Sequence, residues 1–159
     1  MITQKEIMDN EQKIKHKIGL ELTGVGNLSK MLAIQTFSNL QYDITPEQFS
    51  VLSVLMENEE LYQRQISALT LKDRANVSRI LSILEKKGYI LKIESVSGRK
   101  TFKISITEYG RKIYEQVRPT ILKLWAYTCK DIPEEKVDAF FEILSEIKKN
   151  LLVKVNIQI

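Results

Sequence analysis

Four polar side chains stand close together near the start of an amphipathic stretch, DRANVSRILSILEKKGYI, in the middle of the sequence. They are Arg74, Asn76, Ser78 and Arg79. An arginine can donate two parallel hydrogen bonds to guanine O6 and N7, an asparagine can pair with adenine, and a serine can bind a base or a phosphate. This combination of residue types predicts a segment that reads base edges in double-stranded DNA.

Helical spacing places these side chains at the front of a helix that has one apolar side. Asp73 is suited to accept hydrogen bonds from the first-turn amides, and Gly88 is suited to end the helix. The apolar side consists of Val77, Ile80, Leu81 and Leu84, and the opposite side consists of Ala75, Arg79, Ser82 and Lys86. We therefore expect Ala75 and Ser82 to join the side chains that face DNA.

Polar and basic residues outside this helix are candidates for contacts with the sugar–phosphate backbone. Lys72 and Gln65 precede the helix, and Arg99 and Lys100 lie at the tip of a predicted hairpin, which suits them to phosphate or the minor groove. Simple solvent exposure is the alternative interpretation for all of these side chains, as it is for Arg74, Asn76 and Arg79.

The basic charge of the chain is concentrated around the predicted reading helix. The net charge is +4 overall, but residues 61–105 hold ten Lys or Arg against three Asp or Glu, which gives +7. The rest of the chain holds fourteen against seventeen, which gives −3. Charge runs are often only solvated faces, but concentration on one compact segment favours a polyanionic partner.

The bulk properties argue against several classes of protein. With 159 residues, 43% of them hydrophobic and 28% charged, the chain is typical of one soluble globular unit. It has neither an apolar run long enough to span a membrane nor the apolar core of a secretion signal, so we expect a cytoplasmic protein. Cys129 and His16 are the only residues of their types, which argues against a disulfide or a zinc site. No catalytic motif is recognisable, so we expect no cofactor and no enzyme activity.

Two helices are predicted before the reading segment. The first runs from about Glu6 to Phe37, where apolar residues recur at helical spacing, although three glycines are expected to kink or split it. These glycines are Gly19, Gly24 and Gly26. The second helix starts after Thr45 as N-cap, with Pro46 in its first turn, where the missing N–H does no harm.

Further elements are predicted on either side of the amphipathic stretch. A short helix is expected within LYQRQISALTL, with Ile66 and Leu69 on its inner side. After the reading helix, YILKIES and TFKISI alternate with the period of strands and form a hairpin. Thr107 is expected to cap a long helix that Pro119 bends. A last helix near Pro133 is expected to bury Val137, Phe140, Phe141, Leu144, Ile147 and Leu151.

The order of helix, short helix, turn, helix and hairpin is that of a winged helix-turn-helix. We therefore predict a mainly α fold with a small two- or three-stranded antiparallel sheet. The expected division is an N-terminal dimerisation helix over residues 1–40, a DNA-binding domain over 41–108, and C-terminal dimerisation helices over 109–159. The long apolar stripes at both ends of the chain need a partner surface, which favours a homodimer.

Three stretches carry a resemblance to a known family: ITPEQFSVLSVL, RQISALTLKDRANVSRILSILEKKGYI and ISITEYGRKIY. Their order and spacing, from about Ile44 to Tyr114, resemble the MarR family of transcriptional regulators. The resemblance implies a homodimer whose first and last helices interlock and whose two reading helices meet successive major grooves of a near-palindromic operator. It also implies a repressor more often than an activator. In the predicted hairpin, which corresponds to the wing of this family, Gly98, Arg99 and Lys100 stand where the family often has Asp-x-Arg.

The resemblance further implies a pocket between the dimerisation helices and the winged domain, where a small aromatic or lipophilic effector would weaken DNA binding. Four aromatic residues are candidates for its lining: Phe37, Tyr42, Phe49 and Tyr109. A role as core aromatics is an equally good interpretation of these four. For the whole chain, the alternative function is a winged-helix protein-interaction module that does not bind DNA, although the basic charge argues against it.

Overall fold

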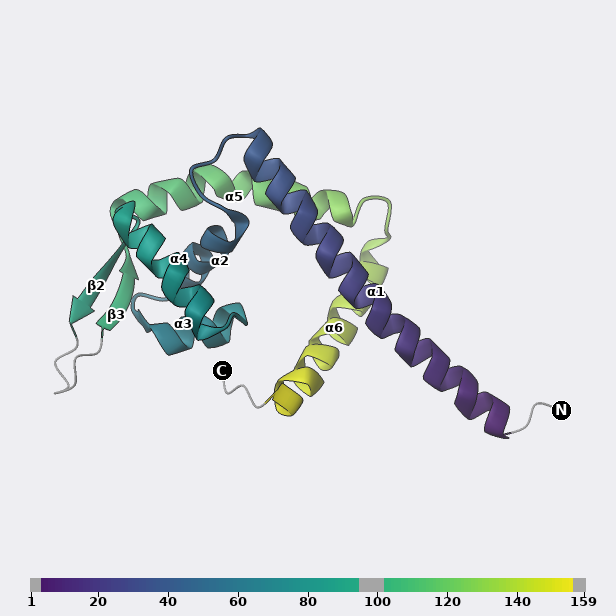
Figure 1. The fold of residues 1–159 in the computed structure, drawn as a ribbon. Coiled ribbons are helices and arrows are strands. Elements are labelled where there is room, and N and C mark those ends of the chain that lie inside the picture. The colour runs from purple at the N-terminus through teal and green to yellow at the C-terminus, as the bar shows by residue number, and fades with distance from the viewer. Residues whose placement is uncertain (1–3, 95–101, 156–159) are drawn as a thin grey trace. The chain divides into compact units, whose positions relative to one another are not determined.

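A computed structural model describes residues 4–94 and 102–155 of the chain (Figure 1). In chain order, its elements are α1 (Gln4–Asn39), α2 (Pro46–Met56), β1 (Leu61–Tyr62), α3 (Gln63–Thr70), α4 (Arg74–Lys86), β2 (Ile90–Glu94), β3 (Phe102–Ile106), α5 (Glu108–Thr128) and α6 (Glu134–Val155). The chain divides into two compact units, Met1–Pro46 and Glu47–Ile159.

The first unit contains α1 and the turn that follows it. α1 is one helix of 36 residues, so the predicted N-terminal helix is confirmed and the expected split is wrong. A Cβ atom built at any of its three glycines would meet no described atom within 4 Å outside the local helix backbone. These glycines therefore lower the intrinsic helix propensity without interrupting the backbone hydrogen bonds.

The second unit has its core between α2, α3, α4 and the sheet. The fully buried side chains of this core come from each of these elements and from the residue that precedes β2. They are Val51, Leu52, Leu55, Ile66, Val77, Ile80, Leu81, Leu84, Tyr89 and Ile104, and α5 adds Val117. The apolar sides predicted for the helix after Thr45 and for the reading helix supply most of them, so hydrophobic burial orients both helices.

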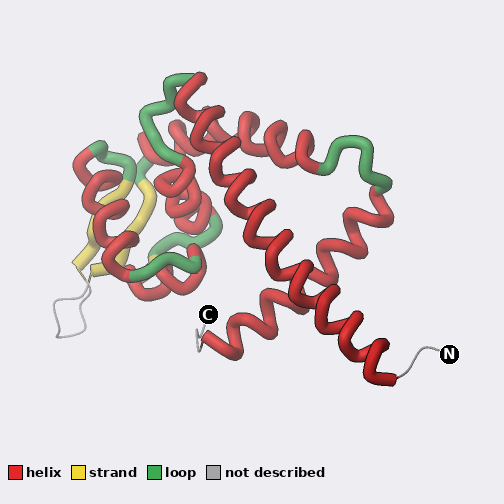
Figure 2. Tube along the Cα trace, turned by 45° about the vertical axis from the view of Figure 1, so that its right-hand side comes forward, coloured by secondary structure: helices red, strands yellow, loops and turns green. Residues whose placement is uncertain are grey.

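The sheet has three antiparallel strands in the order β1, β3, β2. Ile90 pairs with Ile106 and Glu94 with Phe102, which confirms the predicted hairpin. Strand β1 is only two residues long and pairs Leu61 with Ile104. Its residues fall at the start of the stretch that was predicted as a short helix, and α3 begins only after them. Figure 2 shows the strands in yellow beside the helices of the same unit.

The inner side of α3 differs in one residue from the prediction. Ile66 is fully buried, but the side chain of Leu69 is 40% exposed, so its predicted burial is wrong. Helix α3 has only eight residues and ends at Thr70, and its C-cap Leu71 adopts a left-handed conformation with φ 54°. Leu69 therefore lies in the last turn of this short helix, one residue before its end.

A tight joint connects the end of α4 to the start of α5. Gly88, with φ 71°, and Tyr89 donate backbone hydrogen bonds to Glu85 and Leu84, the pattern that closes a helix through a left-handed glycine. Thr107 caps α5 by accepting a hydrogen bond from the Gly110 amide at 3.0 Å, as predicted, and its own amide donates to the Tyr89 carbonyl at 3.0 Å. The two helix ends thus share one network of hydrogen bonds.

The two C-terminal helices form as predicted, but α6 does not bury its apolar residues within the chain. Helix α5 continues through Pro119. No residue of α6 is buried; the side chains of Phe140 and Phe141 are 54% and 68% exposed. The expected burial of this helix is therefore not met by a single chain. Among the described residues, no helix is both long and apolar enough to cross a membrane.

Candidate nucleic-acid interface

Helix α4 has one buried and one exposed side, divided as its sequence predicts. Its buried residues are Val77, Ile80, Leu81 and Leu84. Its exposed residues include five of the predicted DNA contacts: Arg74, Ala75, Ser78, Arg79 and Ser82. Asn76 is half-buried. The first turns of α4 therefore present a polar and cationic surface, while the opposite side anchors the helix in the core.

The start of α4 is fixed by the cap at Asp73. The Asp73 Oδ1 atom accepts a hydrogen bond from the Asn76 amide at 2.8 Å, which confirms the predicted N-cap. The Asp73 backbone is extended, with φ −64° and ψ 156°, as an N-cap requires. Its negative charge also lies at the positive end of the helix dipole. The cap thus sets which residues occupy the first turn.

Arg79 lies in a small cluster with Asn76 and Glu47. Its Nη2 atom donates a hydrogen bond to Asn76 Oδ1 at 3.1 Å and lies 3.8 Å from Glu47 Oε2. Glu47 comes from the first turn of α2. The Arg79 side chain is 66% exposed and that of Glu47 is 31% exposed. The guanidinium group is therefore held in place while it remains accessible to a partner.

Helix α3 is tied to α4 by a side-chain hydrogen bond. Gln63 Nε2 donates to the Arg74 carbonyl at 3.2 Å, across the turn of the helix-turn-helix. Gln65, a predicted phosphate contact, is exposed and accepts a hydrogen bond from the Tyr62 amide at 2.8 Å, so it also closes the first turn of α3. Lys72, in the turn, is half-buried.

Two ion pairs hold the base of the wing formed by β2 and β3. Lys92 of β2 pairs with Glu85 of α4, and Lys103 Nζ of β3 donates to Glu60 Oε2 at 2.8 Å. The hydrogen bond and the charge of Glu60 raise the pKa of Lys103 above its usual value. Arg99 and Lys100, the predicted tip contacts, lie outside the described residues.

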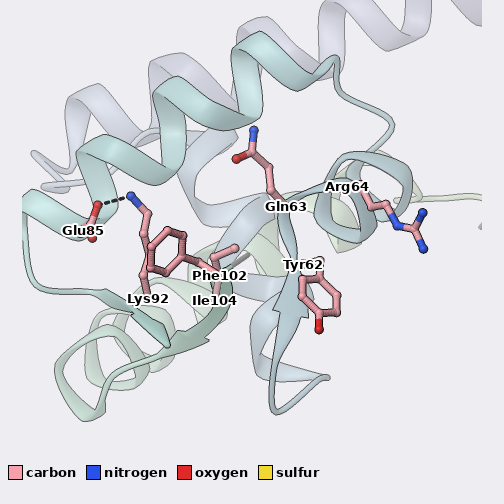
Figure 3. A pocket seen from close by; sticks show the side chains of 7 residues that line it. All are labelled: Tyr62, Gln63, Arg64, Glu85, Lys92, Phe102 and Ile104. Atoms are coloured by element: carbon pink, nitrogen blue, oxygen red, sulfur yellow. Dashed lines mark hydrogen bonds and ion pairs between the residues drawn. The ribbon is translucent and has the colours of Figure 1, made fainter. Parts of the chain in front are cut away.

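A groove of about 940 Å³ runs between the start of α3, the end of α4 and the wing (Figure 3). Its lining consists of Tyr62, Gln63, Arg64, Glu85, Lys92, Phe102 and Ile104. Figure 3 shows the Lys92–Glu85 pair on one side of the groove and Tyr62 on the other. The groove mixes aromatic and charged side chains beside the reading helix and extends the polar surface of α4 toward the wing.

The four aromatic residues predicted for an effector pocket fall in both units of the chain. In the first unit, the Phe37 and Tyr42 rings pack edge to face at 5.4 Å. In the second unit, Phe49 stacks on Tyr114 at 5.1 Å, and Tyr109 packs on Tyr89 at 5.1 Å. Each aromatic ring thus has an aromatic neighbour within its own unit, and a pocket that joins all four stays a prediction.

Several residues at this surface were not expected from the sequence. Glu47, Gln63 and Lys92 contact α4 from other elements, and contacts over such separations have no local signature in a sequence. Arg64 lines the groove beside the predicted contact Gln65, and the basic character of the segment was the only available signal for it. Within the described ranges, no cluster of three or more His, Cys, Asp or Glu residues is arranged to hold a metal ion.

Comparison with known proteins places this surface in a family. Residues 42–100, which include α2 to α4 and β2, match the model of the MarR family. The chain belongs to the MarR family. It is 25% identical over 122 residues to the uncharacterized HTH-type transcriptional regulator YybA of Bacillus subtilis. The matched region covers 75% of this chain and 81% of YybA.

The fold of this MarR-family chain is also similar to solved structures. The structure of an S. aureus MepR–DNA complex is 22% identical, with a TM-score of 0.75 over 83% of this chain and 96% of MepR. Bordetella bronchiseptica BpsR, studied for the regulation of its DNA binding by 6-hydroxynicotinic acid, is 18% identical, with a TM-score of 0.76 over 83% of this chain and 98% of BpsR. The chain is thus a DNA-binding transcriptional regulator of the winged helix-turn-helix type, in a family of non-enzymes.

Proposed function

We propose that this MarR-family regulator binds a near-palindromic operator as a homodimer and reads its sequence with α4. The observation that carries the proposal is the front of α4, where the exposed Arg74, Ser78 and Arg79 and the half-buried Asn76 lie opposite a fully buried apolar side. Arginine and asparagine are the side chains best suited to guanine and adenine in the major groove. Ala75 and Ser82 continue this surface, and Lys72, Gln65, Arg99 and Lys100 are the proposed backbone contacts.

The homodimer is supported by apolar surface that the single chain leaves exposed. Helix α6 exposes six large apolar side chains: Phe140, Phe141, Ile143, Leu151, Val153 and Val155. Helix α1 also exposes a series of large apolar side chains, among them Ile14, Ile18 and Leu28. Apolar patches of this extent are rare on soluble monomers, and a symmetric dimer would cover them. The dimerisation regions are accordingly assigned to residues 1–40 and 109–159.

Within this proposal the regulator acts as a repressor, and a small aromatic or lipophilic molecule releases it from DNA. The support comes from the family resemblance and from BpsR, whose DNA binding is regulated by 6-hydroxynicotinic acid. Release requires that the ligand favour a dimer geometry in which the two reading helices no longer match successive major grooves, which are about 34 Å apart.

Binding to duplex DNA tests the proposal directly. The wild-type chain is used to select sequences from a pool of random duplexes, and affinities for a selected and a random duplex are measured by fluorescence anisotropy at several salt concentrations. We expect enrichment of a near-palindrome and an affinity that falls steeply with salt, because phosphate contacts release counterions. Absence of enrichment together with salt-independent binding would refute the proposal and favour a protein-interaction module.

Replacement of the central reading residue is the second arm of the test. Arg79→Ala should reduce the preference for the selected duplex by roughly 10- to 100-fold, because a bidentate arginine–guanine contact contributes about 1–3 kcal/mol of discrimination. Lys123→Ala, at an exposed position of α5, is the matched control that removes one cation away from α4. Survival of the full preference in Arg79→Ala would show that α4 is not the reading helix.

A further inference from the structure

The reading arginine is in contact with a carboxylate, which is an unexpected neighbour for a DNA-binding side chain. Glu47 Oε2 lies 3.8 Å from Arg79 Nη2, and the two residues belong to different helices, α2 and α4. An exposed ion pair of this length contributes little to folding, since water and salt screen it. Its position on the proposed DNA-binding surface points to a role in binding.

We propose that Glu47 is a specificity-determining residue, which positions Arg79 for a base edge and disfavours its use as a phosphate contact. The proposal rests on the reading role of α4 proposed above. Glu47 acts through Arg79 and needs no contact with DNA itself. It is therefore a positioning residue, and its effect is measured as a change in the affinity for a specific sequence relative to a random one.

The geometry leaves Arg79 able to read a base while it is held. A guanidinium group has five N–H donors in a fixed plane. Asn76 and Glu47 both contact the Nη2 atom. The Nε and Nη1 atoms of Arg79 have no hydrogen-bond partner among the described residues. Since Glu47 Oε2, at 3.8 Å, is beyond hydrogen-bond distance, Asn76 takes only one of the two Nη2 hydrogens. These contacts restrict the position of the group, and the second Nη2 hydrogen can still act together with Nη1 or Nε on the paired acceptors of guanine.

The same carboxylate makes phosphate binding by Arg79 less favourable. On random DNA, most of the affinity comes from cations that neutralise phosphates, and the base edges contribute little. To bind a phosphate, Arg79 must either leave Glu47 or bring the phosphate close to it. The first costs the ion pair and the second places two like charges together, so Glu47 weakens non-specific binding more than specific binding.

The test compares Glu47→Gln with the wild type on the selected and the random duplex. Glutamine keeps the size of the side chain and removes its charge. We expect the variant to bind the random duplex about two- to fivefold more tightly, the range that an exposed ion pair allows. The affinity for the selected duplex should stay within about twofold of the wild-type value. The specificity ratio, which is the affinity for the selected duplex divided by that for the random duplex, therefore falls. The salt dependence on random DNA should become steeper, because Arg79 then joins the phosphate contacts.

A double-mutant cycle separates this role from a general effect of charge. In an Arg79→Ala background, Glu47→Gln should leave the specificity ratio unchanged, because its target is gone. Glu57→Gln is the matched control, since Glu57 is exposed just beyond the opposite end of α2 and undergoes the same chemical change. Circular dichroism melts of each variant report folding independently of DNA.

The outcomes distinguish this proposal from the function on which it depends. The proposal is supported if Glu47→Gln lowers the specificity ratio in the wild type and leaves it unchanged in the Arg79→Ala background. An equal change on both duplexes, a persistent effect without Arg79, or the same effect from Glu57→Gln overturns it while the reading role of α4 stands. If the wild type itself shows no preference between duplexes, the proposed function fails first and the role of Glu47 falls with it.

Discussion

Asp73 caps α4, the proposed reading helix, and its effect on stability is measurable without DNA. Replacement by Ala leaves the Asn76 amide without its partner, and we expect the free energy of unfolding to fall by about 1 kcal/mol. Asp73→Asn keeps an acceptor oxygen and should retain most of that stability. Urea denaturation of the three proteins checks this, and an equal loss in both variants would contradict a capping role.

At the residue scale, the sequence was sufficient for local features and insufficient for contacts between helices. The Asp73 cap, the Thr107 cap and the buried side of α4 follow from spacing within a single helix, and the structure confirms them. The partners Glu47 and Gln63 reach α4 from α2 and α3, so they depend on how helices pack. No pattern within a few residues of Arg79 indicates either partner.

At the element scale, Gly110 in the first turn of α5 allows the closest backbone approach found at a glycine of the described chain. A Cβ atom added there would lie 2.1 Å from the Tyr89 carbonyl oxygen. Since both groups belong to the backbone network that joins α4 to α5, we expect Gly110→Ala to destabilise the protein by about 1–3 kcal/mol. Thermal unfolding measures the effect.

The matched control for this prediction is Gly19→Ala in α1. No described atom outside the local helix backbone lies within 4 Å of its built Cβ, so alanine meets no obstruction there. Because alanine has the higher helix propensity, we expect this variant to be as stable as the wild type or more stable by up to about 1 kcal/mol. Equal melting temperatures for the two variants would show that the contact at Gly110 is relieved by backbone movement.

The elements themselves were largely predictable, and the exceptions have physical reasons. The three glycines of α1 lower its helix propensity. The consecutive backbone hydrogen bonds of a 36-residue helix stabilise it by more than the glycines destabilise it. Strand β1 is too short for an alternating pattern and exists because β3 offers it a pairing edge. Leu69 is three residues from the buried Ile66, but helical spacing alone does not show which neighbouring elements cover a side chain.

At the scale of the whole molecule, the apolar surface of α6 predicts that the oligomer can be disrupted by one charge. Phe141 is 68% exposed in the single chain. The substitution Phe141→Glu would place a carboxylate in the proposed dimer interface. We expect the dimer dissociation constant to rise by roughly tenfold or more in sedimentation experiments, while the circular dichroism of the chain is retained. Lys149→Glu, an exposed site on the same helix, is the control.

A monomeric wild type at micromolar concentration would contradict the dimer proposal without affecting the assignment of α4. An unchanged dissociation constant in Phe141→Glu would instead move the interface away from this part of α6. The sequence indicated the need for a partner, because apolar residues recur along the last helix. It could not show that the chain leaves them uncovered, since that depends on the path of every other element.

The joint between α4 and α5 has a mechanical consequence. Only the short β2–β3 hairpin separates the two helices in sequence. The amide and the hydroxyl of Thr107 join their ends directly through hydrogen bonds with the Tyr89, Gly88 and Gly110 backbones. The end of α4 and the start of α5 are therefore coupled by hydrogen bonds. A change in the orientation of the first turn of α5 would be passed to α4, and with it to the position of Arg79.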